Sequence, residues 1–151
     1  MARTAMVWTR PIVKVATTEA GLAAGTAVEC QLTTAVLSVS NSPNTIPATG
    51  CSGPTSSPGM SQYALQLNWL QDWPIDTGLS RFAWDNDAMP VWVEIIPNKA
   101  DATGSVMTGE FYCLSGGYGG TFGDGSAATA DPPPWAAVAK PDIGDPTPAG
   151  P

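Results

Sequence analysis

Few residues of this sequence have the types and the spacing that chemistry requires. The chain of 151 residues contains no histidine, which removes Ser-His-Asp and Cys-His nucleophiles and the commonest metal ligand together. Asp85, Asn86 and Asp87 resemble the start of a calcium-binding loop, but the glycine and the distal glutamate of an EF-hand are missing at the required offsets. We therefore expect these residues to form the end of a helix and a turn with solvated acids.

Two other motifs have a catalytic or ligand-binding interpretation. Glu94 and Glu110 fall on neighbouring predicted strands, and two carboxylates within reach form the acid and nucleophile of a glycosidase. With 13 acidic residues in the chain, a chance approach is the simpler explanation. The glycine-rich residues 116–125 are followed by neither a Lys-Ser/Thr pair nor a helical pattern, so they do not fit a phosphate-binding loop. We expect no catalytic site, no cofactor and no metal, and hence a protein that is not an enzyme.

The three cysteines are also poor candidates for a reactive or metal-binding site. Cys30, Cys51 and Cys113 are odd in number and widely separated, without a C-x-x-C pair that would indicate zinc or redox chemistry. Free cysteines behave as small hydrophobic residues and are usually inside. The sequence therefore predicts free and mostly buried thiols.

The composition favours a single domain that assembles with partners. Only 13% of the residues are charged, well below the roughly 25% of an average soluble domain, so much of the surface must be uncharged. The net charge of −7 and the pI near 4.1 oppose attraction to phosphate backbones and anionic lipids. Because the sequence shows neither a long apolar run nor the apolar core of a signal peptide, we expect a cytosol-like compartment and no membrane partner.

The pattern of the first half predicts strands separated by a long loop. With 15 prolines and 16 glycines, no long helical pattern survives, and the fold is expected to be mainly β. Residues 26–32 alternate as a strand does, and the apolar phase then slips near Thr33 and Thr34, which indicates a bulge or a break. Residues 41–59 have the composition of an irregular loop, and we expect this loop and the tail after Lys140 to be assembly elements. Residues 60–72 form the clearest strand, with an apolar face at alternate positions.

The second half predicts one helix followed by a β-hairpin. Leu79, Phe82 and Ala83 have helical spacing, with Asp76 or Thr77 available as the N-cap. Residues 91–96 and 105–114 should pair as antiparallel strands. By the parity of the pleat, the core of the helix and hairpin is expected to contain Leu79, Phe82, Val93, Ile95 and Phe111. The opposite face would carry Trp92, Glu94, Thr108, Glu110 and Tyr112.

Residues 78–143 contain several short motifs in a characteristic order. A helical L-x-x-F-x-W-D-N motif comes first, then a hairpin with V-x-V-x-I and T-G-x-F, then a glycine-rich turn, and finally W and K-P. The matching positions are Leu79, Phe82, Trp84, Asp85, Asn86, Val91, Val93, Ile95, Thr108, Gly109, Phe111, Trp135, Lys140 and Pro141. This order resembles the second half of the major tail-tube proteins of long-tailed, non-contractile bacteriophages.

The resemblance implies both a fold and a function. Subunits of that family are β-sandwiches flanked by one helix, and they close into hexameric rings that stack into a tube. Viral double-stranded DNA passes through the lumen without tight binding, and the tube also meets tape-measure and tail-completion proteins. On this basis we expect a tail-tube-like β-sandwich or barrel-like domain over residues 1–140 and a Pro-rich extension over residues 141–151. The expected location is the virion tail, assembled in the host cytoplasm.

An acidic subunit suits such a channel, because a negative lining repels DNA. Glu94 and Glu110 are the candidate lumen charges, since two unpaired carboxylates are costly to bury and at least one should face water. Two alternatives remain open. The chain would also fit a capsid decoration or head-completion protein, or a carbohydrate-binding β-sandwich that stacks sugars on aromatic residues such as Trp69, Trp73, Trp92 and Tyr112.

Overall fold

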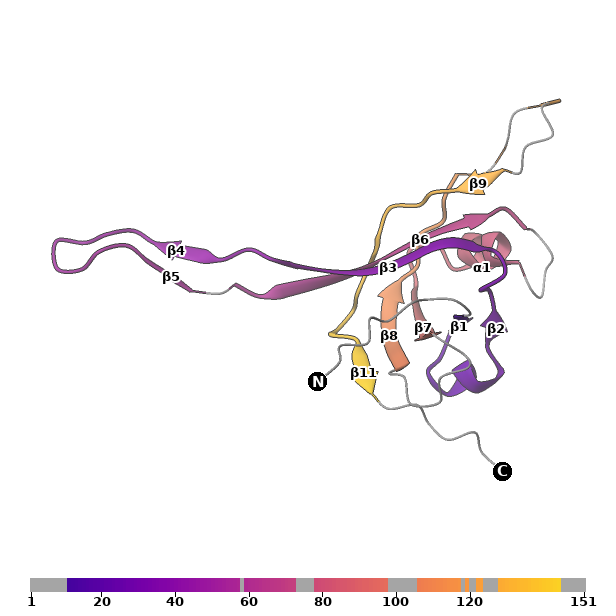
Figure 1. Ribbon diagram of the computed structural model, residues 1–151, viewed down its shortest axis with the longest axis horizontal. Coiled ribbons are helices and arrows are strands. Elements are labelled where there is room, and N and C mark those ends of the chain that lie inside the picture. The colour runs from indigo at the N-terminus through magenta and orange to yellow at the C-terminus, as the bar shows by residue number, and fades with distance from the viewer. Residues whose placement is uncertain are drawn as a thin grey trace, which may run out of the picture.

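The computed structural model describes residues 11–57, 59–72, 78–97, 106–117, 119, 122–123 and 128–144. The chain forms a mainly β body from which a long arm projects (Figure 1), so the predicted fold class is confirmed. The first half contains β1 (Ile12–Ala16), the 3-10 helix η1 (Ala20–Ala24), β2 (Thr26–Ala27), β3 (Leu32–Asn41), β4 (Asn44–Ile46), β5 (Thr55–Ser57) and β6 (Ser61–Leu70). The second half contains α1 (Leu79–Asp85), β7 (Pro90–Ile96), β8 (Val106–Tyr112), β9 (Thr129–Ala130), β10 (Trp135–Ala136) and β11 (Asp142–Gly144).

The five-stranded sheet is built around the predicted hairpin. Its strand order is β11-β8-β7-β1-β2, and β7 pairs with β8 in the register that places Val91 opposite Phe111. Buried and half-buried residues alternate along both strands, because successive side chains point to opposite faces of the sheet. Of the five predicted core residues, Leu79, Val93, Ile95 and Phe111 are buried, whereas Phe82 is half-buried and packs against the core.

The four-stranded sheet contains the two longest strands, β3 and β6, which pair in antiparallel fashion. The predicted strand over residues 60–72 is confirmed as β6, and its predicted apolar face contributes the buried Leu65, Leu67 and Trp69. The strand predicted over residues 26–32 is wrong: β2 ends at Ala27, a turn follows, and β3 begins only at Leu32. The predicted irregularity is present, as the register shifts between Leu32 and Thr34.

A C-terminal segment joins the two sheets at one edge. Trp135 pairs with Leu65 of the four-stranded sheet, and Ala137 then forms a bridge with Phe111 of the five-stranded sheet. The chain next adds β11 to the outer edge of β8, so residues beyond Lys140 take part in the sheet as far as Gly144. Among the described residues neither sheet closes on itself, so the domain is not barrel-like.

The α-helix α1 is held by hydrogen bonds to Trp69 of the four-stranded sheet and to Gln31, which precedes β3. The indole nitrogen of Trp69 donates a hydrogen bond of 2.9 Å to the Ser80 hydroxyl, which satisfies two buried polar groups at once. The Gln31 side chain accepts a hydrogen bond of 2.7 Å from the amide of Leu79. Gly78 occupies the N-cap position, so the prediction of a cap at Asp76 or Thr77 is wrong; both residues lie outside the described part.

Gly109 explains why three residues of the T-G-x-F and K-P motifs lie together. A Cβ at position 109 would lie 2.9 Å from the ring of Phe111 and 3.1 Å from Pro141. The buried Phe111 ring therefore covers the glycine on the inner face of β8, and Pro141 closes over the same place. Any larger residue at position 109 would displace the ring from the core.

Candidate assembly surface

The most distinctive feature of the molecule is a β-hairpin arm, which we define as residues 40–62. Its described residues are all exposed except the partly exposed Gly59. The arm continues β3 and β6 beyond the body (Figure 1), and β4 pairs with β5 in its outer half. The irregular loop predicted over residues 41–59 is therefore wrong at Asn41, β4 and β5, whereas the residues between β4 and β5 do form a loop. Serine, threonine and proline composition indicated a loop throughout, but the short strands β4 and β5 pair with each other, and such cross-strand pairing dominates over local preference.

Specific contacts fix the arm at its base and at its tip. At the base, the Asn41 side chain donates a hydrogen bond of 2.7 Å to the Gly59 carbonyl oxygen. The carbonyl of Ser42 lies where a Cβ on residue 59 would be, so glycine is required there. At the tip, the amide of Thr49 donates to the carbonyl of Ser52 over 2.8 Å. The arm is thus an ordered hairpin and has a definite direction.

The arm carries no charged side chain. Residues 30–71 contain no aspartate, glutamate, lysine or arginine, so every charge of the chain lies outside β3, the arm and β6. Apolar side chains are also exposed here: Ile46 is 54% exposed and Met60 is 90% exposed. A long projection that is uncharged and partly apolar is typical of a surface that contacts another protein.

The second open feature is the outer edge of β3. This strand is the last of its sheet, so among the described parts of the chain its ten residues have β6 on one side and no strand on the other. Natural edge strands are normally protected by charges, prolines or short length. β3 has none of these protections. Among the described residues, the other edges of the two body sheets are formed by strands of only two or three residues, namely β2, β9, β10 and β11.

The predicted acidic pair lies on the outer face of the five-stranded sheet, as the pleat requires. Glu94 is opposite Lys14 of β1 and Thr108 of β8, while Glu110 is opposite Trp92. Both glutamates are half-buried. They lie on adjacent strands but are not directly opposite each other. Glu94 has the positively charged Lys14 opposite it on β1, whereas the residue opposite Glu110 is the uncharged Trp92.

The acidic turn after the helix has structural contacts for each of its residues. Asp85 forms an ion pair of 3.1 Å with Arg81, and the Asn86 side chain donates to the carbonyl of Phe82 over 2.9 Å. Asp87 accepts a hydrogen bond of 2.8 Å from the amide of Ser115. The prediction of a helix end that leads into the hairpin is confirmed. No group of three or more histidine, cysteine, aspartate or glutamate side chains suitable for a metal occurs in the described residues.

Of the aromatic residues considered for a sugar platform, one lies in the core. Trp69 is 1% exposed and packs edge to face on Trp135, with ring centroids 6.3 Å apart. It belongs to the core, so its predicted role as a stacking residue is wrong. Trp92 is half-buried, Tyr112 is exposed, and Trp73 lies outside the described residues.

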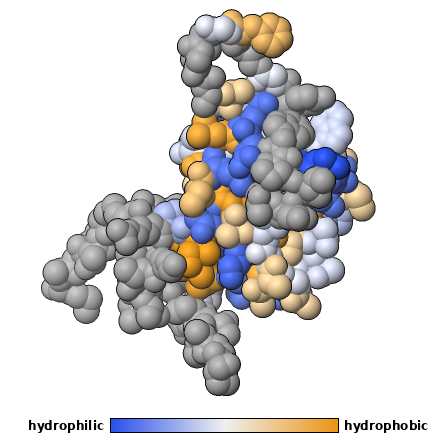
Figure 2. All heavy atoms as spheres, turned by 90° about the vertical axis from the view of Figure 1, so that its right-hand side faces the viewer, coloured by the Kyte–Doolittle hydropathy of each residue, from blue (hydrophilic) through white to orange (hydrophobic). Residues whose placement is uncertain are grey.

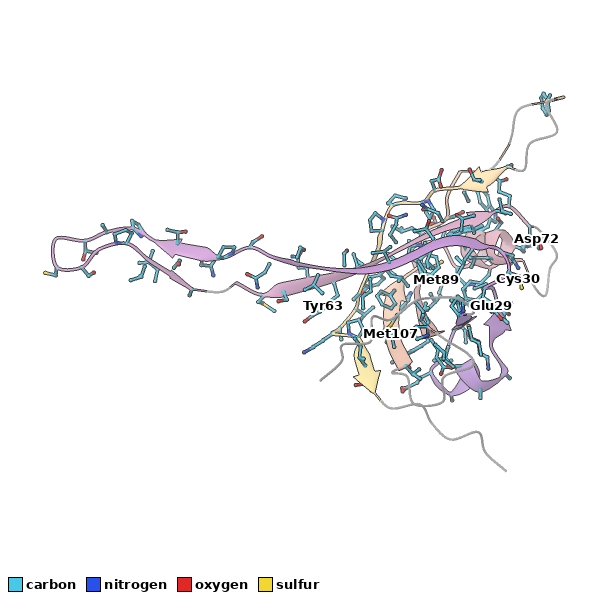
Figure 3. All side chains as sticks on the ribbon, viewed as in Figure 1. Glu29, Cys30, Tyr63, Asp72, Met89 and Met107 are labelled. Carbon is cyan, nitrogen blue, oxygen red and sulfur yellow. The ribbon has the colours of Figure 1, made fainter. Side chains whose placement is uncertain are left out.

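The cysteines divide into two exposed thiols and one buried thiol, so the prediction of mostly buried thiols holds only for Cys113. Cys51 lies in the turn at the arm tip, whereas Cys30 lies on the far side of the body (Figure 3). These two thiols are therefore too distant to pair within one copy. Burial, with a smaller contribution from Asp87, raises the pKa of Cys113 to about 12.

The side of the body opposite the arm is mixed in character. Hydrophilic and hydrophobic residues are interspersed there, without one continuous apolar patch among the visible described residues (Figure 2).

Among the described helices, none has the length and apolar character to span a membrane. No protein-family model matches the chain, and no curated protein matches it significantly.

Proposed function

We propose that this protein is a self-assembling structural subunit, and specifically the tube subunit of a long-tailed bacteriophage. The observation that carries the proposal is the ordered, uncharged arm, which is exposed along its length and reaches away from the body. A two-stranded hairpin alone is marginally stable in water. An arm of this kind is best explained by a neighbour that covers it in the assembled state.

The distribution of charge supports the same function. The net charge of −7 resides entirely outside the arm and the two long strands, so contacts through them incur no cost for burying ions. The remaining acidic surface repels DNA at long range. In the proposed assembly, copies form hexameric rings that stack in the virion tail after assembly in the host cytoplasm. The other partners are tape-measure and tail-completion proteins and the passing DNA.

Electron microscopy of the purified protein tests the proposal directly. Tubes of uniform diameter, or rings that stack at high protein concentration, are the expected result. A protein that stays monomeric but binds isolated phage heads would favour capsid decoration or head completion instead. Binding to a glycan array without assembly would favour a carbohydrate-binding role.

A further inference from the structure

The arm and the edge of β3 have complementary requirements. The arm is a two-stranded ribbon without a covering layer, and β3 is a long strand whose outer edge has no neighbour among the described residues. The edge of β3 has room for one more strand, and the arm can provide that strand. An additional strand completes the open backbone hydrogen bonds of an edge, and a third strand stabilises a hairpin.

The contact must lie between copies. The arm is a direct continuation of β3 and β6 and points away from the body (Figure 1), so it does not return to its own β3. Both surfaces lie within the uncharged residues 30–71, which favours their mutual burial over contact with a charged partner. We propose that the edge of β3 in one copy accepts the arm of a second copy as an added β-strand.

This pairing determines the kind of assembly that results. Each copy has one arm and one β3 edge, so the contact joins two different surfaces and leaves one of each available for the next copy. Such a head-to-tail contact produces either a closed ring or an open fibre, depending on the rotation per step. The inference rests on the proposed self-assembly and names the surfaces through which it occurs.

Prolines in the arm limit the length of the added ladder. Pro43 and Pro47 flank β4, while Pro54 and Pro58 flank β5, and proline has no amide hydrogen to donate. An uninterrupted ladder on the arm therefore spans the three residues of β4 or of β5. Such a short ladder holds two copies together only weakly, so the contact becomes stable only when many copies contribute.

Photo-crosslinking tests the proposed pairing. Val36 is 51% exposed on β3, so a benzoylphenylalanine at this position should be tolerated. Copies labelled with ¹⁴N and ¹⁵N are mixed before assembly, irradiated and digested with pepsin. The expected product joins residue 36 of one isotope to an arm peptide of the other. The same probe at Glu19, which is exposed beside η1, is the matched control and should give no arm product.

Hydrogen exchange of the unmodified protein gives an independent measurement. Assembly should slow exchange of alternate amides of β3, the outward-facing ones, by about tenfold or more. Tubes that form without arm crosslinks at residue 36 and without this slowing would overturn the pairing and leave the proposed function intact. Absence of any assembly in microscopy would overturn both.

Discussion

Phe111 joins three parts of the fold through one side chain. It is fully buried, it covers Gly109 on the same strand, and it forms a bridge with Ala137 of the C-terminal segment. Phe82, in contrast, is only partly buried at the surface of the core. The sequence pattern placed both phenylalanines in the core, but in the structure Phe111 is buried more completely than Phe82.

Truncation of the two phenylalanines should therefore have unequal effects. We expect Phe111→Ala to lower the free energy of unfolding by about 3 to 5 kcal/mol, as for other fully buried aromatic residues. Phe82→Ala should lower it by less, because part of the ring already contacts water. Urea denaturation of the two variants measures the difference. An equal loss in both would mean that the helix packs more tightly than its exposure indicates.

The three thiols should differ in reactivity. Cys30 and Cys51 are exposed and should react with a maleimide in the native protein, whereas Cys113 should react only after unfolding. Replacement of Cys30 and Cys51 by serine leaves Cys113 alone for a direct control. Rapid labelling of this variant under native conditions would contradict the buried position.

The raised pKa of Cys113 also has a consequence for stability. In the unfolded chain the thiol ionises around its usual pKa of 9.0, while in the folded protein it stays protonated to about 12. The unfolded state therefore binds fewer protons between these values, and stability falls as the pH rises through that window. Below pH 9 the contribution is constant. Cys113→Ser should make denaturation midpoints less dependent on pH in this range.

At the level of elements, the arm can be removed without touching the core. Asn41 and Gly59 are joined by a hydrogen bond across the base of the arm, so a short turn can replace the residues between them. We expect this variant to fold with an unchanged thermal transition, because the described residues that it removes bury nothing in the core. Assembly should be lost, as measured by light scattering and microscopy.

A smaller deletion serves as the control for the arm variant. Removing only the tip between β4 and β5 keeps the paired strands and should weaken assembly less than removal of the whole arm. Normal tubes from the armless protein would show that the arm has another role.

At the level of the whole molecule, the proposed tube function predicts that the acidic balance affects DNA passage. Glu110 is the better of the two candidate lumen charges for a test, because Glu94→Lys would place two lysines opposite each other at Lys14. Glu110→Lys should leave assembly intact and slow DNA release from virions at low salt. High salt should reduce the effect by screening. An unchanged ejection rate from properly formed tails would place Glu110 outside the channel.

The sequence determined the parts of this protein that depend on local pattern. Alternation gave β6 and the β7–β8 hairpin with their correct faces, and helical spacing gave α1, because side-chain period follows backbone geometry. The predictions failed where long-range pairing dominates. Residues 41–59 look like a loop, yet they continue two strands that run side by side from the body.

Residues 41–59 were expected to act in assembly, but the shape of the candidate assembly surface could not be predicted for the same reason. The absence of charge over residues 30–71 is visible in the sequence, but whether such a stretch is buried or exposed depends on what packs against it. The hydrogen bond from the Leu79 amide to Gln31 and the contact of Gly109 with Phe111 and Pro141 likewise join residues distant in the chain. The tertiary structure decided which uncharged strand packs in the core, which forms the arm and which is left as an open edge. The reason is that only the strand order determines which neighbouring strand each backbone pairs with.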